Sequence, residues 1–127
     1  IDNTTASANI ARELYKEAKA KGFEFLDAPI SGGQAGAEGG ILTVMVGGDE
    51  APFKKAEPVI DCYSKKIKLL GPSGSGQLTK MVNQIFVASI IQGLAEGLTF
   101  AKDKKLNIEK TLKSHFRWCR AIVAIRK

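Results

Sequence analysis

The feature that most constrains this chain is a helical pattern that continues without a break from about residue 77 to residue 104. Apolar side chains recur along it at helical spacing: Leu78, Met81, Val82, Ile85, Phe86, Ile90, Leu94, Leu98 and Phe100. Such a helix extends roughly 40 Å, because each residue adds about 1.5 Å. Between residues 85 and 91 the pattern is apolar almost all round, which predicts burial on several sides. We therefore expect further protein mass, from a longer chain or a second subunit, to cover it.

Residues 1–70 alternate between helix-like and strand-like segments, a pattern typical of an α/β fold with a layered sheet. The expected strands are residues 23–27, 41–48 and 66–70. Between the first two strands, residues 31–40 contain five glycines and are expected to form a loop.

Two amphipathic helices are expected, one before the first of these strands and one between the second and the third. The first covers residues 6–21, with Thr4 or Thr5 as its N-cap and Gly22 at its C-terminal end. The second begins at Asp49 and Glu50, has Pro52 in its first turn, and should be kinked or shortened by Pro58. Its expected inner face consists of Phe53, Ala56, Val59 and Ile60.

Charge and cysteine content argue against several function classes. The net charge is +6, but residues 115–127 supply four basic residues and no acid, so the rest of the chain is only weakly basic. In residues 1–114 the lysines are interleaved with acids, which is typical of a solvated surface. We therefore expect no nucleic-acid partner. Cys62 and Cys119 lack metal-ligand spacing, and His115 cannot complete a zinc site with them. We expect free thiols, a cytoplasmic location, no bound metal and no membrane partner.

The glycine-rich stretch before the long helix, GPSGSGQLTK, does not fit the common phosphate-binding motifs. A P-loop requires lysine directly after its last glycine, whereas three residues separate Gly76 from Lys80. The dinucleotide fingerprint G-x-G-x-x-G also fails, because Thr79 occupies the position of its last glycine.

A second interpretation of this stretch is catalytic. Lys80 lies in the first turns of the helix, with Asn83 on the same face and Gln84 beside it. A helix N-terminus and burial both disfavour a protonated amine, so such a lysine can act as a general acid or base. Asn83 can donate and accept hydrogen bonds to a substrate hydroxyl. The alternative is a surface lysine beside a solvated asparagine.

The loop PISGGQAG also allows two interpretations. Ser31, Gly32 and Gly33 could offer a hydroxyl and backbone N–H groups to a carboxylate. The alternative is a flexible turn without a ligand.

Two motifs in this order, FLDAPISGGQAGAEGGILTVMVGGDEAPF and GPSGSGQLTKMVNQ, resemble the β-hydroxyacid dehydrogenase family. Its members include 3-hydroxyisobutyrate dehydrogenase and 6-phosphogluconate dehydrogenase, and the 3-hydroxyisobutyrate-like branch fits best. The resemblance extends from Ile1 to about Ser114. It implies an α/β fold in which the C-terminal part of a Rossmann-like NAD(P)-binding domain is followed by the first long helix of an all-α domain.

The resemblance also implies a set of site residues. Ser31, Gly32 and Gly33 match the substrate-binding SGG motif, and Lys80 matches the catalytic lysine. Asn83 or Gln84 would contact the substrate, and Thr5 would lie against NAD or NADP near the nicotinamide.

The implied activity is interconversion of a 3-hydroxyacid and its semialdehyde by hydride transfer, with Lys80 as general acid/base. We expect residues 1–72 to be the rear of the Rossmann-like domain and residues 73–114 to begin the helical domain. The chain would then be an inactive fragment of a homo-oligomeric enzyme. The alternative, from another class, is a non-catalytic small-anion-binding or oligomerisation module.

Residues 115–127 depart from the resemblance. One choice of synonymous codons for HFRWCRAIVAIRK, read one base later, encodes ISGGAGQSWQSE, which resembles the family's continuation. We therefore hypothesise a frameshifted tail, in which His115, Trp118 and Cys119 have no evolved role.

Overall fold

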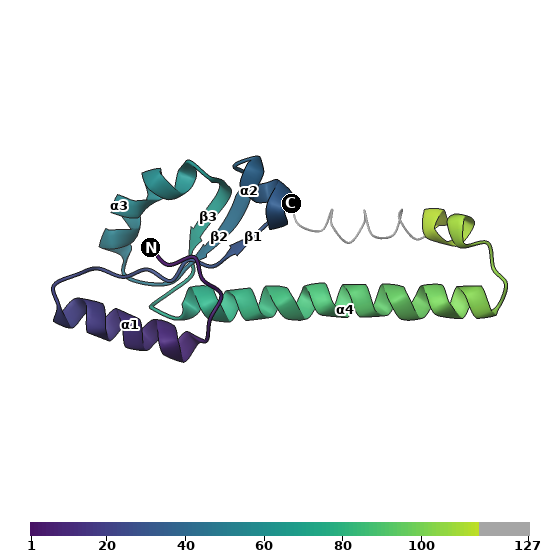
Figure 1. Cartoon of the computed structure of the whole chain (residues 1–127), viewed down its shortest axis with the longest axis horizontal. Helices are drawn as coiled ribbons and strands as arrows, with labels where there is room; N and C mark the ends of the chain where they lie inside the picture. The colour runs from purple at the N-terminus through teal and green to yellow at the C-terminus, as the bar shows by residue number, and fades with distance from the viewer. Residues whose placement is uncertain (115–127) are drawn as a thin grey trace. The chain divides into compact units, whose positions relative to one another are not determined.

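The computed structural model describes residues 1–114, so the expected frameshifted tail and Cys119 lie outside the described residues. Its elements are α1 (Ala8–Ala20), β1 (Ile30–Ser31), α2 (Gly33–Glu38), β2 (Leu42–Val46), α3 (Glu50–Asp61), β3 (Ser64–Leu69) and α4 (Ser75–Asp103) (Figure 1). The chain divides into two compact units, Ile1–Ile85 and Phe86–Lys127, and α4 belongs to both. This element order confirms the α/β fold class expected from the sequence.

The first unit is built on a small mixed sheet with strand order β1-β2-β3. β1 pairs with β2 in antiparallel orientation, placing Ser31 opposite Thr43, and β2 pairs with β3 in parallel. An isolated parallel bridge between Asp2 and Asp27 places the N-terminal residues beside the segment that leads into β1. The helix α3 forms the connection between parallel β2 and β3, as such a crossover requires.

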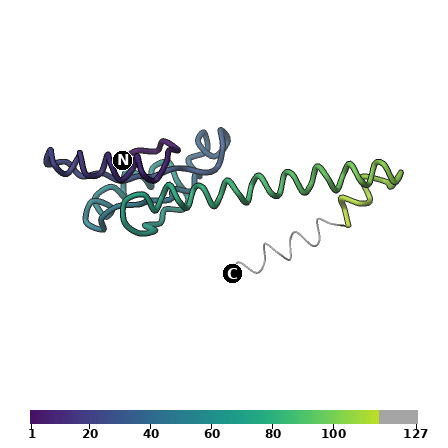
Figure 2. The backbone as a smooth tube through the Cα atoms, turned by 90° about the horizontal axis from the view of Figure 1, so that it is seen from below, coloured from purple at the N-terminus to yellow at the C-terminus, as the bar shows by residue number. Residues whose placement is uncertain are grey.

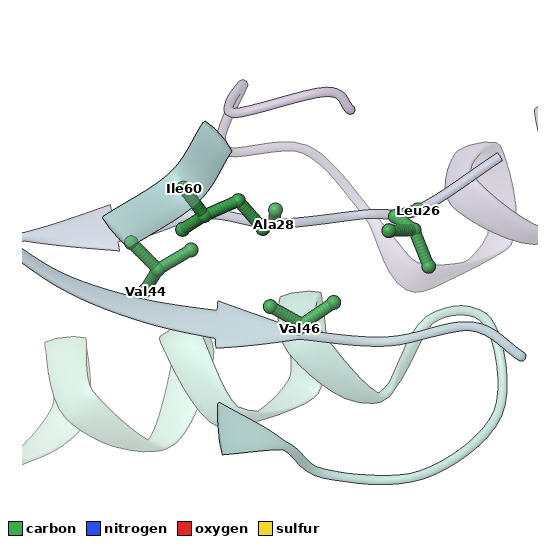
Figure 3. Close-up of a cluster of buried hydrophobic side chains, with 5 residues drawn as sticks. All are labelled: Leu26, Ala28, Val44, Val46 and Ile60. Carbon is green, nitrogen blue, oxygen red and sulfur yellow. The ribbon is translucent and has the colours of Figure 1, made fainter. Parts of the chain in front are cut away.

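The core of this unit lies between the sheet and α3. Leu26, Ala28, Val44, Val46 and Ile60 form one buried cluster. Figure 3 shows Val44 and Val46 extending from β2 toward Ala28 and Ile60. Helix α3 lies on one side of the strands and α1 on the other (Figure 1). The purple N-terminal segment leads directly into α1 (Figure 2).

The start of α1 differs from the expected start. Its N-cap is Ser7, whose Oγ accepts a hydrogen bond of 3.2 Å from the Ile10 N–H. Thr4 and Thr5 are therefore not caps, and they belong to an irregular segment before the helix. Gly22 follows the helix end with φ of +79°, a conformation that glycine adopts at little cost.

Residues 23–40 also depart from the expectation. The predicted strand 23–27 is wrong, because Asp27 alone takes part in bridges, to Asp2 and Gly47. The predicted loop 31–40 is wrong as well, because it contains the end of β1 and the short helix α2. Gly32, with φ of +142°, forms the turn between them, and its carbonyl accepts from the Gly36 N–H at 3.1 Å.

Helix α3 follows the predicted start at Asp49 and buries Pro52 and Ile60. The prediction that Val59 belongs to its inner face is wrong, because 58% of Val59 is exposed. Pro58 lies inside the helix, which continues to Asp61 although proline lacks an N–H for the helical ladder.

The second unit is described from residue 86 to residue 114 and contains most of α4. Phe86, Ile90, Ile91, Leu94 and Phe100 are at least half exposed within the described residues. By length and mean hydropathy (1.3) alone, α4 meets the criteria for a membrane span, although core helices of soluble proteins meet them too. What covers this helix stays a prediction.

A surface cluster links α1 to the start of α3. The Tyr15 hydroxyl donates to Asp49 Oδ2 at 2.7 Å, and Lys19 Nζ lies 2.7 Å from the same oxygen. The hydrogen bond from Lys19, followed by that from Tyr15, lowers the pKa of the Asp49 carboxyl. The same carboxylate raises the pKa of the Lys19 amine.

We expect Asp49→Asn to lower the melting temperature near pH 6, and the difference to vanish as the pH falls toward about 2. A carboxyl whose pKa is lower in the folded state stabilises it above the unfolded pKa, near 3.9, and this stabilisation disappears as the pH falls through the folded pKa. Because the cluster is exposed, the effect is small and added salt reduces it. Thermal melts of both proteins across this pH range measure it, with Asp61→Asn as the control. A difference in melting temperature between wild type and Asp49→Asn that is the same near pH 6 and near pH 2 would contradict a stabilising role of the Asp49 carboxylate.

Candidate active site

The substrate-binding candidates Ser31, Gly32 and Gly33 lie at the end of β1 and the start of α2. Ser31 is half-buried, whereas the two glycines are exposed. Gly33 has φ of +62°, and a Cβ on Gly32 would lie 2.9 Å from Leu42 Cδ2. The turn therefore depends on glycine at both positions, and it leaves their backbone open to solvent.

Lys80 lies on the second turn of α4 and its side chain points to this turn. Its Nζ donates a hydrogen bond of 2.7 Å to the carbonyl of Ile30, the residue directly before Ser31. The side chain is half-buried rather than free in solvent. The structure thus brings together two motifs that lie about fifty positions apart in the sequence.

Asn83 and Gln84 follow Lys80 on α4. Asn83 is half-buried and its Nδ2 donates to Gln84 Oε1 at 3.1 Å, whereas Gln84 is exposed. Asn83 lies about one turn from Lys80, so the two share a helix face. Among the described residues, neither side chain hydrogen-bonds to the turn at 31–33.

Thr5, the candidate for cofactor contact, is exposed in the segment before α1. The backbone groups on both sides of Thr5 are hydrogen-bonded to the side chain of Gln77. Gln77 Nε2 donates to the Thr4 carbonyl at 2.7 Å, and Gln77 Oε1 accepts from the Ala6 N–H at 2.9 Å. The first turn of α4 therefore holds the backbone around Thr5.

Asp27 is a buried acid that the sequence analysis did not single out. Its side chain is inaccessible to solvent, and its two oxygens accept hydrogen bonds at the start of α4. Oδ1 accepts from the Gly74 N–H at 2.8 Å, and Oδ2 from the Gln77 N–H at 3.0 Å. These N–H groups lack helical partners and carry the positive end of the helix dipole, so they stabilise the buried carboxylate.

Two glycines make room for this carboxylate. A Cβ on Gly47 would lie 2.6 Å from Asp27 Oδ1, and one on Gly76 would lie 2.4 Å from the Met45 carbonyl oxygen. The segment before β1, the end of β2 and the start of α4 thus meet without space for an added methyl group.

The signal that could have identified Asp27 is its setting, FLDAPI, in which a single acid interrupts an apolar segment. A buried acid requires hydrogen-bond partners, so its position predicts a polar contact. Gln77 offers no comparable signal, because a glutamine in a first helical turn is usually solvated.

The arrangement is compatible with a dinucleotide cofactor. Asp2 and Asp27 form a parallel bridge, and Thr5 and Ser31 follow these two residues by three and four positions along the chain. In α/β folds, ligands bind beyond the carboxyl ends of the strands. Thr5 is exposed there and available to a cofactor, whereas the phosphate-binding glycine fingerprint is absent from this sequence.

Comparison with known proteins identifies the family of this chain. Residues 1–71 match the family described as the NAD binding domain of 6-phosphogluconate dehydrogenase. An uncharacterized oxidoreductase of Shewanella frigidimarina is 60% identical over 107 residues, which cover 84% of this chain and 37% of that protein. Mitochondrial 3-hydroxyisobutyrate dehydrogenase of Drosophila melanogaster is 42% identical over 101 residues, or 80% of this chain and 31% of that enzyme.

Among solved structures, 3-hydroxyisobutyrate dehydrogenase of Mycobacterium tuberculosis with L-serine superimposes with a TM-score of 0.85 at 35% identity. The match covers 90% of this chain and 39% of that protein. The chain therefore spans about 40% or less of the length of these relatives.

Proposed function

This chain belongs to the family of 6-phosphogluconate dehydrogenase NAD-binding domains, and from this premise we propose that it forms part of an NAD(P)-dependent 3-hydroxyacid dehydrogenase. Lys80 is the general acid/base of the reaction. Ser31, Gly32 and Gly33 bind the substrate carboxylate, while Asn83 or Gln84 contacts the substrate hydroxyl. The complete enzyme is a cytosolic homo-oligomer.

The observation that carries this proposal is the hydrogen bond of 2.7 Å from Lys80 Nζ to the Ile30 carbonyl. It places an amine next to Ser31, so a hydroxyacid bound at residues 31–33 has its alcohol within reach of that amine. A general base must lie within hydrogen-bond distance of the proton that it removes.

In the oxidative direction, Lys80 in its neutral form accepts the proton of the substrate hydroxyl. The electron pair of the broken O–H bond would form the carbonyl of the semialdehyde as the carbinol C–H bond releases its hydride. NAD(P)⁺, when bound, supplies the hydride acceptor. In reduction, Lys80 returns the proton to the oxygen. Thr5 is the residue of this chain that would lie against the cofactor near the nicotinamide.

The site and the relatives both support this substrate class. The turn at 31–33 offers a hydroxyl and open backbone to a carboxylate, and two of the relatives are named 3-hydroxyisobutyrate dehydrogenase. A short 3-hydroxyacid therefore places its carboxylate at the turn and its terminal alcohol at Lys80.

The second candidate function is a non-catalytic module that binds a small anion or associates through α4. The exposed apolar side chains of that helix in the described residues favour it. This module would bind hydroxyacids without converting them, whereas the enzyme reduces one cofactor molecule for each hydroxyacid oxidised.

We expect the full-length protein that carries this sequence to oxidise 3-hydroxyisobutyrate, 3-hydroxypropionate or L-serine with NAD⁺ or NADP⁺. Lactate and 2-hydroxybutyrate serve as matched controls, because each has the carboxylate but no 3-hydroxyl. Formation of reduced nicotinamide, measured by absorbance, tests the proposal. Binding of the 3-hydroxyacids without turnover on either cofactor would favour the non-catalytic module instead.

A further inference from the structure

We propose that Gln77 is a positioning residue, whose side-chain amide holds the cofactor-side segment at Thr5 in register with Lys80. This inference rests on the proposed function, since it assigns a role in the same reaction to a residue that contacts neither reactant. Gln77 is 1% exposed, so its amide has no access to solvent.

The amide of Gln77 bridges the two backbone groups that flank Thr5. Its nitrogen donates to the Thr4 carbonyl at 2.7 Å, and its oxygen accepts from the Ala6 N–H at 2.9 Å. Two opposed bonds to one planar group fix both the position and the direction of this short segment. A carboxamide suits this task, because it presents a donor and an acceptor together.

The backbone of Gln77 is itself held in place. Its N–H donates to Asp27 Oδ2 at 3.0 Å, and the other oxygen of that carboxylate accepts from the Gly74 N–H at 2.8 Å. Asp27 therefore secures the first turn of α4 against the segment that continues into β1. Ser31 ends that segment, so the turn at 31–33 is also held in place through Asp27.

Lys80 lies three residues after Gln77, on the same side of a regular helix. The same part of α4 thus holds two contacts: Gln77 bonds residues 4–6, and the Lys80 amine bonds the Ile30 carbonyl. The amide of Gln77 therefore fixes the distance between Thr5, the proposed cofactor contact, and the amine of Lys80.

Removing the amide should harm turnover more than hydroxyacid binding. Hydride transfer requires close alignment of donor and acceptor, and a displacement of about 1 Å can lower the rate about 100-fold. We expect Gln77→Met, which keeps the length of the side chain, to lower kcat by about 10- to 100-fold. The cofactor KM rises, while the hydroxyacid KM stays within about twofold, because the turn at 31–33 keeps its anchor on Asp27.

Gln77→Glu keeps the hydrogen-bond acceptor of the side chain but removes its donor. A carboxylate can accept from the Ala6 N–H, but it repels the Thr4 carbonyl. The matched control is Gln92→Met, at an exposed glutamine on the same helix whose Nε2 donates to Glu96. We expect Gln77→Glu to lower kcat as Gln77→Met does, and the control to keep the wild-type values.

The experiment measures kcat and both KM values in the full-length protein, together with hydrogen exchange of the Ala6 amide. In the wild type this amide exchanges more slowly than that of Thr5, and in Gln77→Met the difference is lost. An active wild type whose kcat and cofactor KM survive Gln77→Met overturns this inference alone. A wild type that is inactive on all 3-hydroxyacids removes the proposed function instead. If Gln77→Met does not fold, Gln77→Glu replaces it, and an Ala6 amide that exchanges as fast as Thr5 in the wild type also overturns the inference.

Discussion

Lys80→Ala in the full-length protein that carries this sequence lowers kcat by about 10²- to 10⁴-fold, the usual contribution of a general acid–base group. Truncating the side chain to a methyl group removes the amine that bonds the Ile30 carbonyl beside Ser31, and with it the proposed acceptor of the hydroxyl proton. Steady-state turnover of the best 3-hydroxyacid measures the loss. Small primary amines added to the buffer are expected to restore part of the rate, because they can occupy the space that the side chain leaves.

Lys66→Ala is the control for Lys80→Ala. Lys66 is an exposed lysine on β3, and its loss changes the net charge equally without touching the site. We expect wild-type kcat for this variant. A Lys80→Ala enzyme that keeps kcat within a few-fold of wild type on every substrate would rule out the proposed proton transfer.

Gly76→Ala is expected to destabilise the protein by about 3 kcal/mol, the upper part of the range for an overfilled site. The added methyl group would lie 2.4 Å from the Met45 carbonyl oxygen and 2.7 Å from the Asp27 carbonyl oxygen. Both are backbone atoms, so neither can turn away, and the start of α4 must shift from Asp27. Chemical denaturation of wild type and variant measures the difference.

Gly93→Ala makes the same substitution at another glycine of α4. Among the described residues, no heavy atom lies within 4 Å of a Cβ built at this position. Alanine in a helix interior is about 0.5–1 kcal/mol more favourable than glycine, so this variant gains stability. Equal losses at the two positions would show that packing around Asp27 does not explain the effect of Gly76→Ala.

Periodicity in the sequence was sufficient to locate α1, β2, α3, β3 and α4, because it reflects which face of each element is buried. It failed where packing against another element decides the local structure. The glycine-rich residues 31–40 read as a loop, yet α2 forms there, with Gly36 so close to Leu42 that a Cβ would lie 3.2 Å from its side chain. Composition alone carries no information about that neighbour.

The candidate site was only partly predictable for the same reason. The resemblance singled out Lys80 and Ser31, and the structure places them next to each other, although their roles remain predictions. The partners of Asp27 and Gln77 could not be predicted, because they are distant in sequence. The hydrogen bonds of Asp27 span 47 and 50 positions, and those of the Gln77 amide span 71 and 73. Only the folded backbone shows that these groups meet.

The enclosure of Asp27 by Gly47 and Gly76 also has an evolutionary consequence. A side chain at Gly76 would meet backbone oxygens whatever residues stand at the other two positions, so we expect Gly76 to be retained in descendants of this gene. At Gly47 the closest atoms are the carboxylate oxygens of Asp27, so we expect a larger residue there to arise only together with a change of Asp27.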